Sequence, residues 1–141
     1  MAYIDRADWH WLNGYPQDLS REAAATRPGM FVAWAIFSGL GGGDLMGFEK
    51  EIVKLKNRTI TPGQFFIEAC DCKFMDDNLS AEGNAFVAAN YYYVNYCEAY
   101  YEKLIEDLPT FYHIADSWEN FDRIKPFLDE LLAKWRVRQM P

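Results

Sequence analysis

The chain has 141 residues, of which 50% are hydrophobic and 17% aromatic, and 21 acidic residues against 14 basic ones give a formal net charge of -7. This composition excludes a disordered chain, and the acidity disfavours nucleic acid and anionic membranes as partners because both would repel the protein. The acidity permits a basic protein partner. No apolar run approaches the roughly 20 residues that a membrane-spanning helix needs.

The N-terminal segment and the cysteines bear on the cellular location. The segment Met1 to Arg6 lacks the basic start and apolar core of a signal peptide. Three cysteines, an odd number, fit reduced thiols in a small intracellular protein. We therefore expect a cytoplasmic protein, and the length fits one domain covering residues 1–141.

Helical signals dominate from residue 20 onward. The stretch 21–40 is helical in composition, but Pro28 should kink or restart it, and a second helix is expected at 45–57. Thr61 and Gln64 form a capping-box pattern with Pro62 at the first helical position, which predicts a helix from 62 to about 73. Pro126 is expected to open the last helix, which ends near residue 138.

The longest expected helix runs from Ser80 to Asp107. Ser80 is a good N-cap, Glu82 suits the positive end of the helix dipole, and no proline follows until Pro109. Two apolar stripes rich in tyrosine run along this stretch, whereas a surface helix normally shows one. No segment alternates long enough to indicate a sheet. The sequence therefore predicts an all-α, single-domain bundle of five to six helices around a long central helix at about 80–107.

Sulfur and nitrogen ligands do not form a metal-binding pattern. The candidates would be Cys70, Cys72 and Cys97 with His10 and His113. Zinc sites favour two to four residues between paired cysteines, and positions 70 and 72 point apart on a helix. We interpret the cysteines as buried apolar residues and expect neither a metal nor another cofactor. Nothing in the spacing selects a cysteine and histidine pair for nucleophilic catalysis.

Several short motifs occur in order along most of the chain and together carry a family resemblance. They are Asp8-Trp9-His10, Gly29-Met30-Phe31 with Trp34, Cys70-Asp71-x-Lys73-Phe74, Asp77-x-Leu79-x-x-Glu82-Gly83-x-x-Phe86 with Tyr91-Tyr92, and Asp116-x-Trp118. The set resembles a family of small, uncharacterised bacterial proteins. Its members resemble the stand-alone proteins that accompany secreted polymorphic toxins, which implies an immunity role and no established catalytic residues.

The resulting hypothesis is a cytoplasmic immunity protein that binds and neutralises a cognate, basic toxin. Acidic residues where one helix ends and the next begins would steer the partner, and exposed aromatic residues would anchor it. Each acidic residue also has a structural explanation, as a turn former or a helix-dipole partner, and the tryptophans also fit a core position. The candidate partner-binding residues are Asp71, Asp76, Asp77, Glu82, Trp9 and Trp11.

Two alternatives stay open. The first is a small enzyme whose polar residues would have to converge in one cleft, namely Asp8, His10, Asp71, Lys73 and Glu82. The second is a helical adaptor that dimerises through the tyrosine-rich helix.

Overall fold

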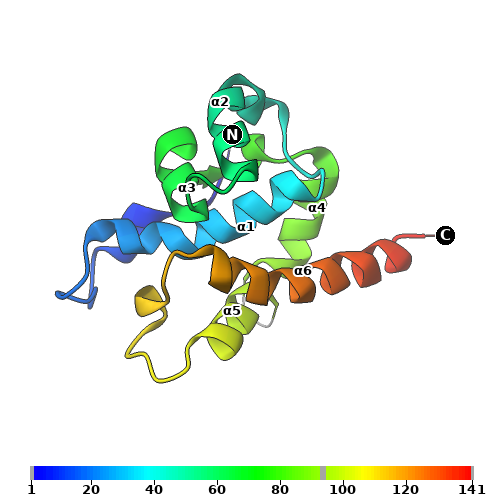
Figure 1. Cartoon of the computed structure of the whole chain (residues 1–141). Coiled ribbons are helices and arrows are strands. Elements are labelled where there is room, and N and C mark those ends of the chain that lie inside the picture. Colours follow the sequence, from blue (N-terminus) through cyan, green and yellow to red (C-terminus); the bar gives the residue numbers. More distant parts are fainter. Residues whose placement is uncertain (1, 93–94, 141) are drawn as a thin grey trace.

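Helix α1, Thr26–Phe37, lies in the middle of the structure, and the other helices surround it (Figure 1). The computed structural model describes residues 2–92 and 95–140. The other α-helices are α2 (Glu49–Lys56), α3 (Pro62–Cys70), α4 (Ala81–Asn90), α5 (Tyr96–Leu104) and α6 (Trp118–Arg138). The 3-10 helices are η1 (Ala7–His10), η2 (Arg21–Ala25), η3 (Gly43–Phe48), η4 (Asp76–Asn78) and η5 (Phe111–His113). The predicted all-α bundle is thus confirmed.

No helix in residues 2–92 and 95–140 is long and apolar enough to cross a membrane.

Helix α1 is central because it is apolar on every side. No charged residue occurs between Gly29 and Phe37, and all side chains from Met30 to Ala35 are buried. A helix of this kind is stable only when neighbours cover its whole circumference. Gly29 lets the backbones of α1 and α3 approach closely, because a Cβ at this position would lie 2.7 Å from the carbonyl oxygen of Pro62 at the start of α3.

The expected long helix at 80–107 is wrong as a single element. Helix α4 ends at Asn90 and α5 begins at Tyr96. Residues 93 and 94 of the expected helix lie outside the described residues. Asparagine side chains on both sides of the interruption donate to backbone carbonyls. Asn90 Nδ2 donates to the Phe86 carbonyl at 3.0 Å, and Asn95 Nδ2 donates to the Ala89 carbonyl at 2.8 Å. Asparagine side chains compete with the helical backbone in this way, so two shorter helices replace the expected long central helix.

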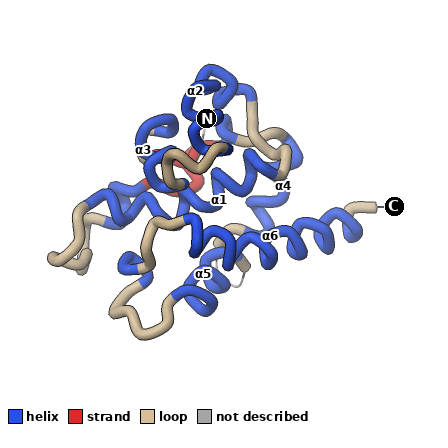
Figure 2. Tube along the Cα trace, in the orientation of Figure 1, coloured by secondary structure: helices blue, strands red, loops and turns tan. Residues whose placement is uncertain are grey.

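A small antiparallel sheet, absent from the sequence prediction, connects the N-terminus to the end of α3. Strand β1, Tyr3–Arg6, pairs with β2, Lys73–Met75, and Figure 2 shows both strands beside α3. Asp5 is opposite Phe74 in this register. Strands of three or four residues are too short for their alternation to stand out in a sequence.

Local capping signals gave more accurate boundaries. The capping box is confirmed, because Gln64 N–H donates to Thr61 Oγ1 at 3.2 Å and Thr61 N–H donates to Gln64 Oε1 at 2.8 Å. The Ser80 cap is also present, accepting from Gly83 N–H at 3.1 Å. Helix α3 ends at Cys70, earlier than the expected 73, because Asp71 takes the left-handed conformation with φ of 53°.

Neither Pro28 nor Pro126 interrupts the α-helix in which it lies. Pro28 is the third residue of α1, where the backbone N–H has no helical partner to lose. Pro126 lies inside α6 rather than at its start, because Ser117 caps the helix by accepting from Asn120 N–H at 3.1 Å. Buried residues occur on both sides of Pro126, so packing outweighs a proline cost of about 3 kcal/mol. They are Phe121, Ile124, Leu128, Leu132 and Trp135.

The left-handed conformation at the end of α3 leads to a stability prediction. Replacement Asp71→Gly should raise the free energy of unfolding by about 0.5–1 kcal/mol, because glycine adopts positive φ without a Cβ penalty. The substitution also removes the ion pair between Asp71 and Lys73, whose charged atoms are 3.2 Å apart. This pair contributes little to stability because the Asp71 side chain is 89% exposed. Urea unfolding measures the change. A decrease in stability would contradict the assigned backbone conformation, and Asp71→Ala serves as a control that keeps the penalty.

Candidate partner-binding site

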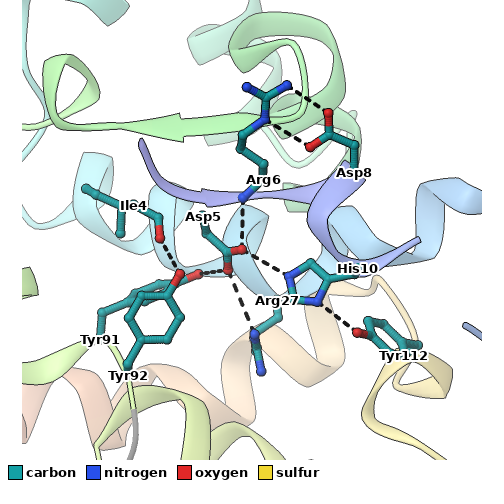
Figure 3. Close-up of polar contacts among 9 residues, drawn as sticks. All are labelled: Ile4, Asp5, Arg6, Asp8, His10, Arg27, Tyr91, Tyr92 and Tyr112. Atoms are coloured by element: carbon teal, nitrogen blue, oxygen red, sulfur yellow. Dashed lines mark hydrogen bonds and ion pairs between the residues drawn. The ribbon is translucent and has the colours of Figure 1, made fainter. Parts of the chain in front are cut away.

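A buried carboxylate, Asp5, organises the polar side chains near the N-terminus (Figure 3). The residue is 1% exposed, and its Oδ1 accepts hydrogen bonds from the Arg6 N–H at 2.8 Å and from His10 Nε2 at 3.0 Å. Its Oδ2 accepts a hydrogen bond from the Tyr91 hydroxyl at 2.9 Å. These partners satisfy a group that would otherwise be costly to bury.

Arg27 supplies the positive charge that faces this carboxylate. Its guanidinium lies 3.8 Å from Asp5 Oδ2 and stacks over the Phe111 ring, 4.4 Å from the ring centroid. Burial alone lowers the pKa of Arg27, but the surrounding Tyr91, Cys97 and Asp5 raise it further than burial lowers it. Arg27 therefore remains charged, and the pair links β1 to α1.

His10 extends the network to η5. Its Nδ1 hydrogen-bonds the Tyr112 hydroxyl at 2.8 Å, so an Asp5–His10–Tyr112 chain of hydrogen bonds joins β1, η1 and η5. Sequence reasoning missed Asp5, Arg27, Tyr91 and Tyr112, since contact between them depends on how the fold brings distant segments together.

The five polar residues of the enzyme hypothesis do not meet in one cleft. Asp8 pairs with Arg6 at 2.7 Å on the side of β1 opposite to His10, as Figure 3 shows. Glu82 pairs with Arg136 of α6 at 2.8 Å, which lowers the pKa of the Glu82 carboxyl. Asp71 and Lys73 pair with each other near the sheet. His10, Glu82 and the Asp71–Lys73 pair thus lie in different surroundings, so the five side chains do not converge.

The four predicted acidic residues have different surroundings. Asp71 and Asp77 are exposed. Asp76 is half-buried and accepts from Ala2 N–H at 3.1 Å, and this hydrogen bond lowers the pKa of Asp76. Glu82 is exposed but paired with Arg136. Asp71, Asp76 and Asp77 therefore flank strand β2, whereas Glu82 belongs to the α4–α6 contact.

The two predicted tryptophans differ in exposure. Trp9 is 48% exposed and packs edge-to-face on Tyr3, itself 45% exposed, with 6.4 Å between ring centroids. The core position that its sequence also allowed is wrong for Trp9. Trp11 is half-buried, and its indole N–H donates to the Arg21 carbonyl at 3.0 Å. Trp9 is thus the more exposed of the two tryptophans.

Five of these residues lie on or next to the paired strands β1 and β2, and we call this group the N-terminal face. Arg6 connects its parts, because the guanidinium lies 4.5 Å from the Tyr3 ring centroid and also binds Asp8. A hollow of about 370 Å³ beside Tyr3 lies between β1 and α4. The N-terminal face consists of Tyr3, Asp8, Trp9, Asp71 and Asp76.

Of the three cysteines expected to be buried, Cys70 is buried, whereas Cys72 and Cys97 are half-buried. Burial raises the pKa of Cys70 to about 12 and that of Cys97 to about 11, so neither is a thiolate at neutral pH. Within residues 2–92 and 95–140, no group of three or more His, Cys, Asp or Glu side chains is placed to hold a metal ion.

Comparison with known proteins gives a family but no activity. A family model described as "Domain of unknown function (DUF7832)" matches residues 3–114. This match covers most of the chain, so the protein belongs to that family. No curated protein and no solved structure matches the chain. The matched region contains the whole Asp5 network and the N-terminal face, whereas α6 lies beyond it.

The Asp5 network predicts a large effect from a small substitution. Asp5→Asn should lower the free energy of unfolding by about 3 kcal/mol, because it leaves the buried Arg27 charge without a counter-charge. Asp8→Asn is the matched control on the exposed side of β1, and it should cost less than about 1 kcal/mol. Urea unfolding of both variants measures the difference. Equal losses would contradict the assigned role of Asp5.

Three fully buried tyrosines predict cooperative loss of stability in alkali. Burial raises the pKa of Tyr91, Tyr96 and Tyr100 above the ordinary value. The folded state keeps protons that the unfolded state loses above about pH 10, so stability should fall as pH rises past that value. Ultraviolet absorbance and circular dichroism should show these hydroxyls ionising together with unfolding. Ionisation of all tyrosines while the fold persists would refute this.

Proposed function

We propose that the protein is an immunity protein, which binds a cognate toxin in the cytoplasm through the N-terminal face and neutralises it. The observation that carries the proposal is the exposed Trp9–Tyr3 pair next to acidic side chains. The family resemblance of the motifs supports an immunity role in particular.

The aromatic pair has the properties of an interface anchor. Tryptophan, tyrosine and arginine are enriched among residues that dominate binding energy, and Trp9 and Arg6 both contact the Tyr3 ring here. Large aromatic side chains held by neighbours lose little conformational freedom when a partner covers them. The hollow beside Tyr3 offers space for a partner side chain.

The charge around the anchor favours a basic partner. The net charge of -7 repels acidic surfaces at long range, and Asp71 and Asp76 place part of that charge on the N-terminal face. Such charges mainly raise the association rate and exclude partners of the wrong sign. Many nucleases and other toxins that act on phosphate-rich targets need basic surfaces, which an acidic face would complement.

The buried tyrosines argue for this face over the tyrosine-rich segment. Tyr91, Tyr96 and Tyr100 pack against the chain's own core, and Phe31 of α1 lies 5.0 Å from Tyr91 between ring centroids. These three side chains are therefore used inside the molecule, which supports a binding site elsewhere.

Co-expression with products of neighbouring genes tests the function. One such product should stop growth when expressed alone, and co-expression with this protein should restore growth. The purified pair should form a stable complex in size-exclusion chromatography with light scattering. The proposal fails if no neighbouring product is toxic, or if toxicity persists in the presence of this protein.

Variants of the N-terminal face test its role in that complex. Trp9→Ala should weaken binding about tenfold or more, as expected for an aromatic anchor. Tyr101→Ala removes a similarly exposed ring from α5, outside the face, and should leave affinity unchanged. Isothermal titration calorimetry compares the two. Equal affinities of both variants for the toxin would mean that the toxin binds outside the N-terminal face.

The acidic residues should act on the association rate. Asp8→Asn with Asp71→Asn, both in the N-terminal face, should slow association several-fold at low salt, with less effect at high salt. Glu98→Gln with Glu102→Gln removes the same charge from exposed positions of α5. Stopped-flow measurements distinguish a local effect from one of net charge. Equal slowing in both double variants would contradict a specific acidic face.

A further inference from the structure

An open apolar groove lies between the end of α1 and α2. Its volume is about 440 Å³, and its apolar walls come from Ile36, Leu45, Ile52 and Val53. Val53 is 56% exposed even though it belongs to a helix with a buried face. Glycines at positions 39, 41 and 42 also line the groove.

Backbone contacts join this groove to the acidic turn of η4. Gly42 N–H donates to the Asn78 carbonyl at 2.8 Å, and a Cβ at Gly42 would lie 2.8 Å from the Asp77 carbonyl oxygen. The close approach requires glycine. It places Asp77, which is exposed, at one border of the groove.

The charged residues around the groove are mostly acidic. Glu49 and Lys56 line it, Asp44 directly precedes the groove residue Leu45, and Asp77 begins the segment 77–79 that Gly42 contacts. Within the described residues, no ion pair neutralises Asp44, Glu49 or Asp77. An apolar floor with unneutralised carboxylates at its border is complementary to an apolar side chain flanked by cationic ones.

We infer that this groove, the α1–α2 groove, binds a segment of the partner protein in which one aliphatic side chain is flanked by arginine or lysine. The aliphatic group occupies the space over Val53 and Ile52, and the flanking cations face Asp44, Glu49 and Asp77. The inference rests on the proposed function, and it adds a second contact region on the other side of η4 from the N-terminal face.

A peptide probe tests the groove without the partner. The probe is a capped seven-residue peptide with a central leucine, flanked on both sides by arginines, and it is titrated into the isotope-labelled full chain. Saturable chemical-shift changes should map to residues 39–45 and 52–56. Two control peptides replace the leucine by serine or the arginines by glutamates, and both should bind at least tenfold more weakly.

Two valine variants provide the matched comparison. Val53→Arg puts a cation into the groove and should weaken peptide binding at least tenfold. Val137→Arg makes the same change at an equally open position of α6, with Val137 64% exposed, and should change binding less than twofold. The inference is overturned by equal losses in both variants, by shifts outside the groove, by equal binding of the glutamate peptide, or by a wild-type dimer that Val53→Arg dissociates.

The outcome is separable from that of the proposed function. If a cognate toxin is neutralised equally well by wild type and Val53→Arg with the same affinity, the groove inference fails and the immunity role stands. If no neighbouring product is toxic, the immunity role fails, and the peptide titration alone decides whether the groove binds its ligand class.

Discussion

The Asp5 carboxylate is the interaction on which the N-terminal third of the structure depends. It gathers partners from segments far apart in sequence: Arg27 of α1 through an ion pair, and Tyr91, directly after α4, through a hydrogen bond. An ionised carboxylate in an apolar interior is tolerable only when such partners surround it, so the network forms as a unit or leaves a large penalty. It holds β1 against the body, and β1 in turn pairs with β2.

This constraint connects the fold to the proposed function. Residues on the two sides of β1 have different contacts. Asp5 and His10 belong to the buried network, while Tyr3 and Asp8 of the N-terminal face contact Arg6 on the other side. Trp9 of η1 lies in sequence between Asp5 and His10, so the network holds the chain on both sides of it. An anchor that is already ordered costs less entropy on binding, which favours a tight complex. The α1–α2 groove lies beyond η4 and is shaped by glycine backbone contacts instead.

Local sequence signals predicted local structure well and predicted contacts across the fold poorly. The Thr61–Gln64 capping box and the Ser80 cap depend on residues within one turn, so the sequence defines them. The identity of the central helix depends on burial from all sides, and the uncharged run in α1 was a better indicator than the tyrosine stripes of 80–107. Of the candidate site, the exposed acidic turn followed from composition. Asp5 did not, because its partners meet only through tertiary packing.

The most direct test of this account is hydrogen exchange of the free wild-type protein at Arg6 and Ala7. Their amides donate to Asp5 Oδ1 and to the Cys72 carbonyl at 2.8 and 3.0 Å. If the Asp5 network orders the N-terminal segment before any partner binds, both amides should exchange nearly as slowly as those of α1. Exchange as fast as in the exposed turn at 12–14 would contradict a preformed N-terminal face.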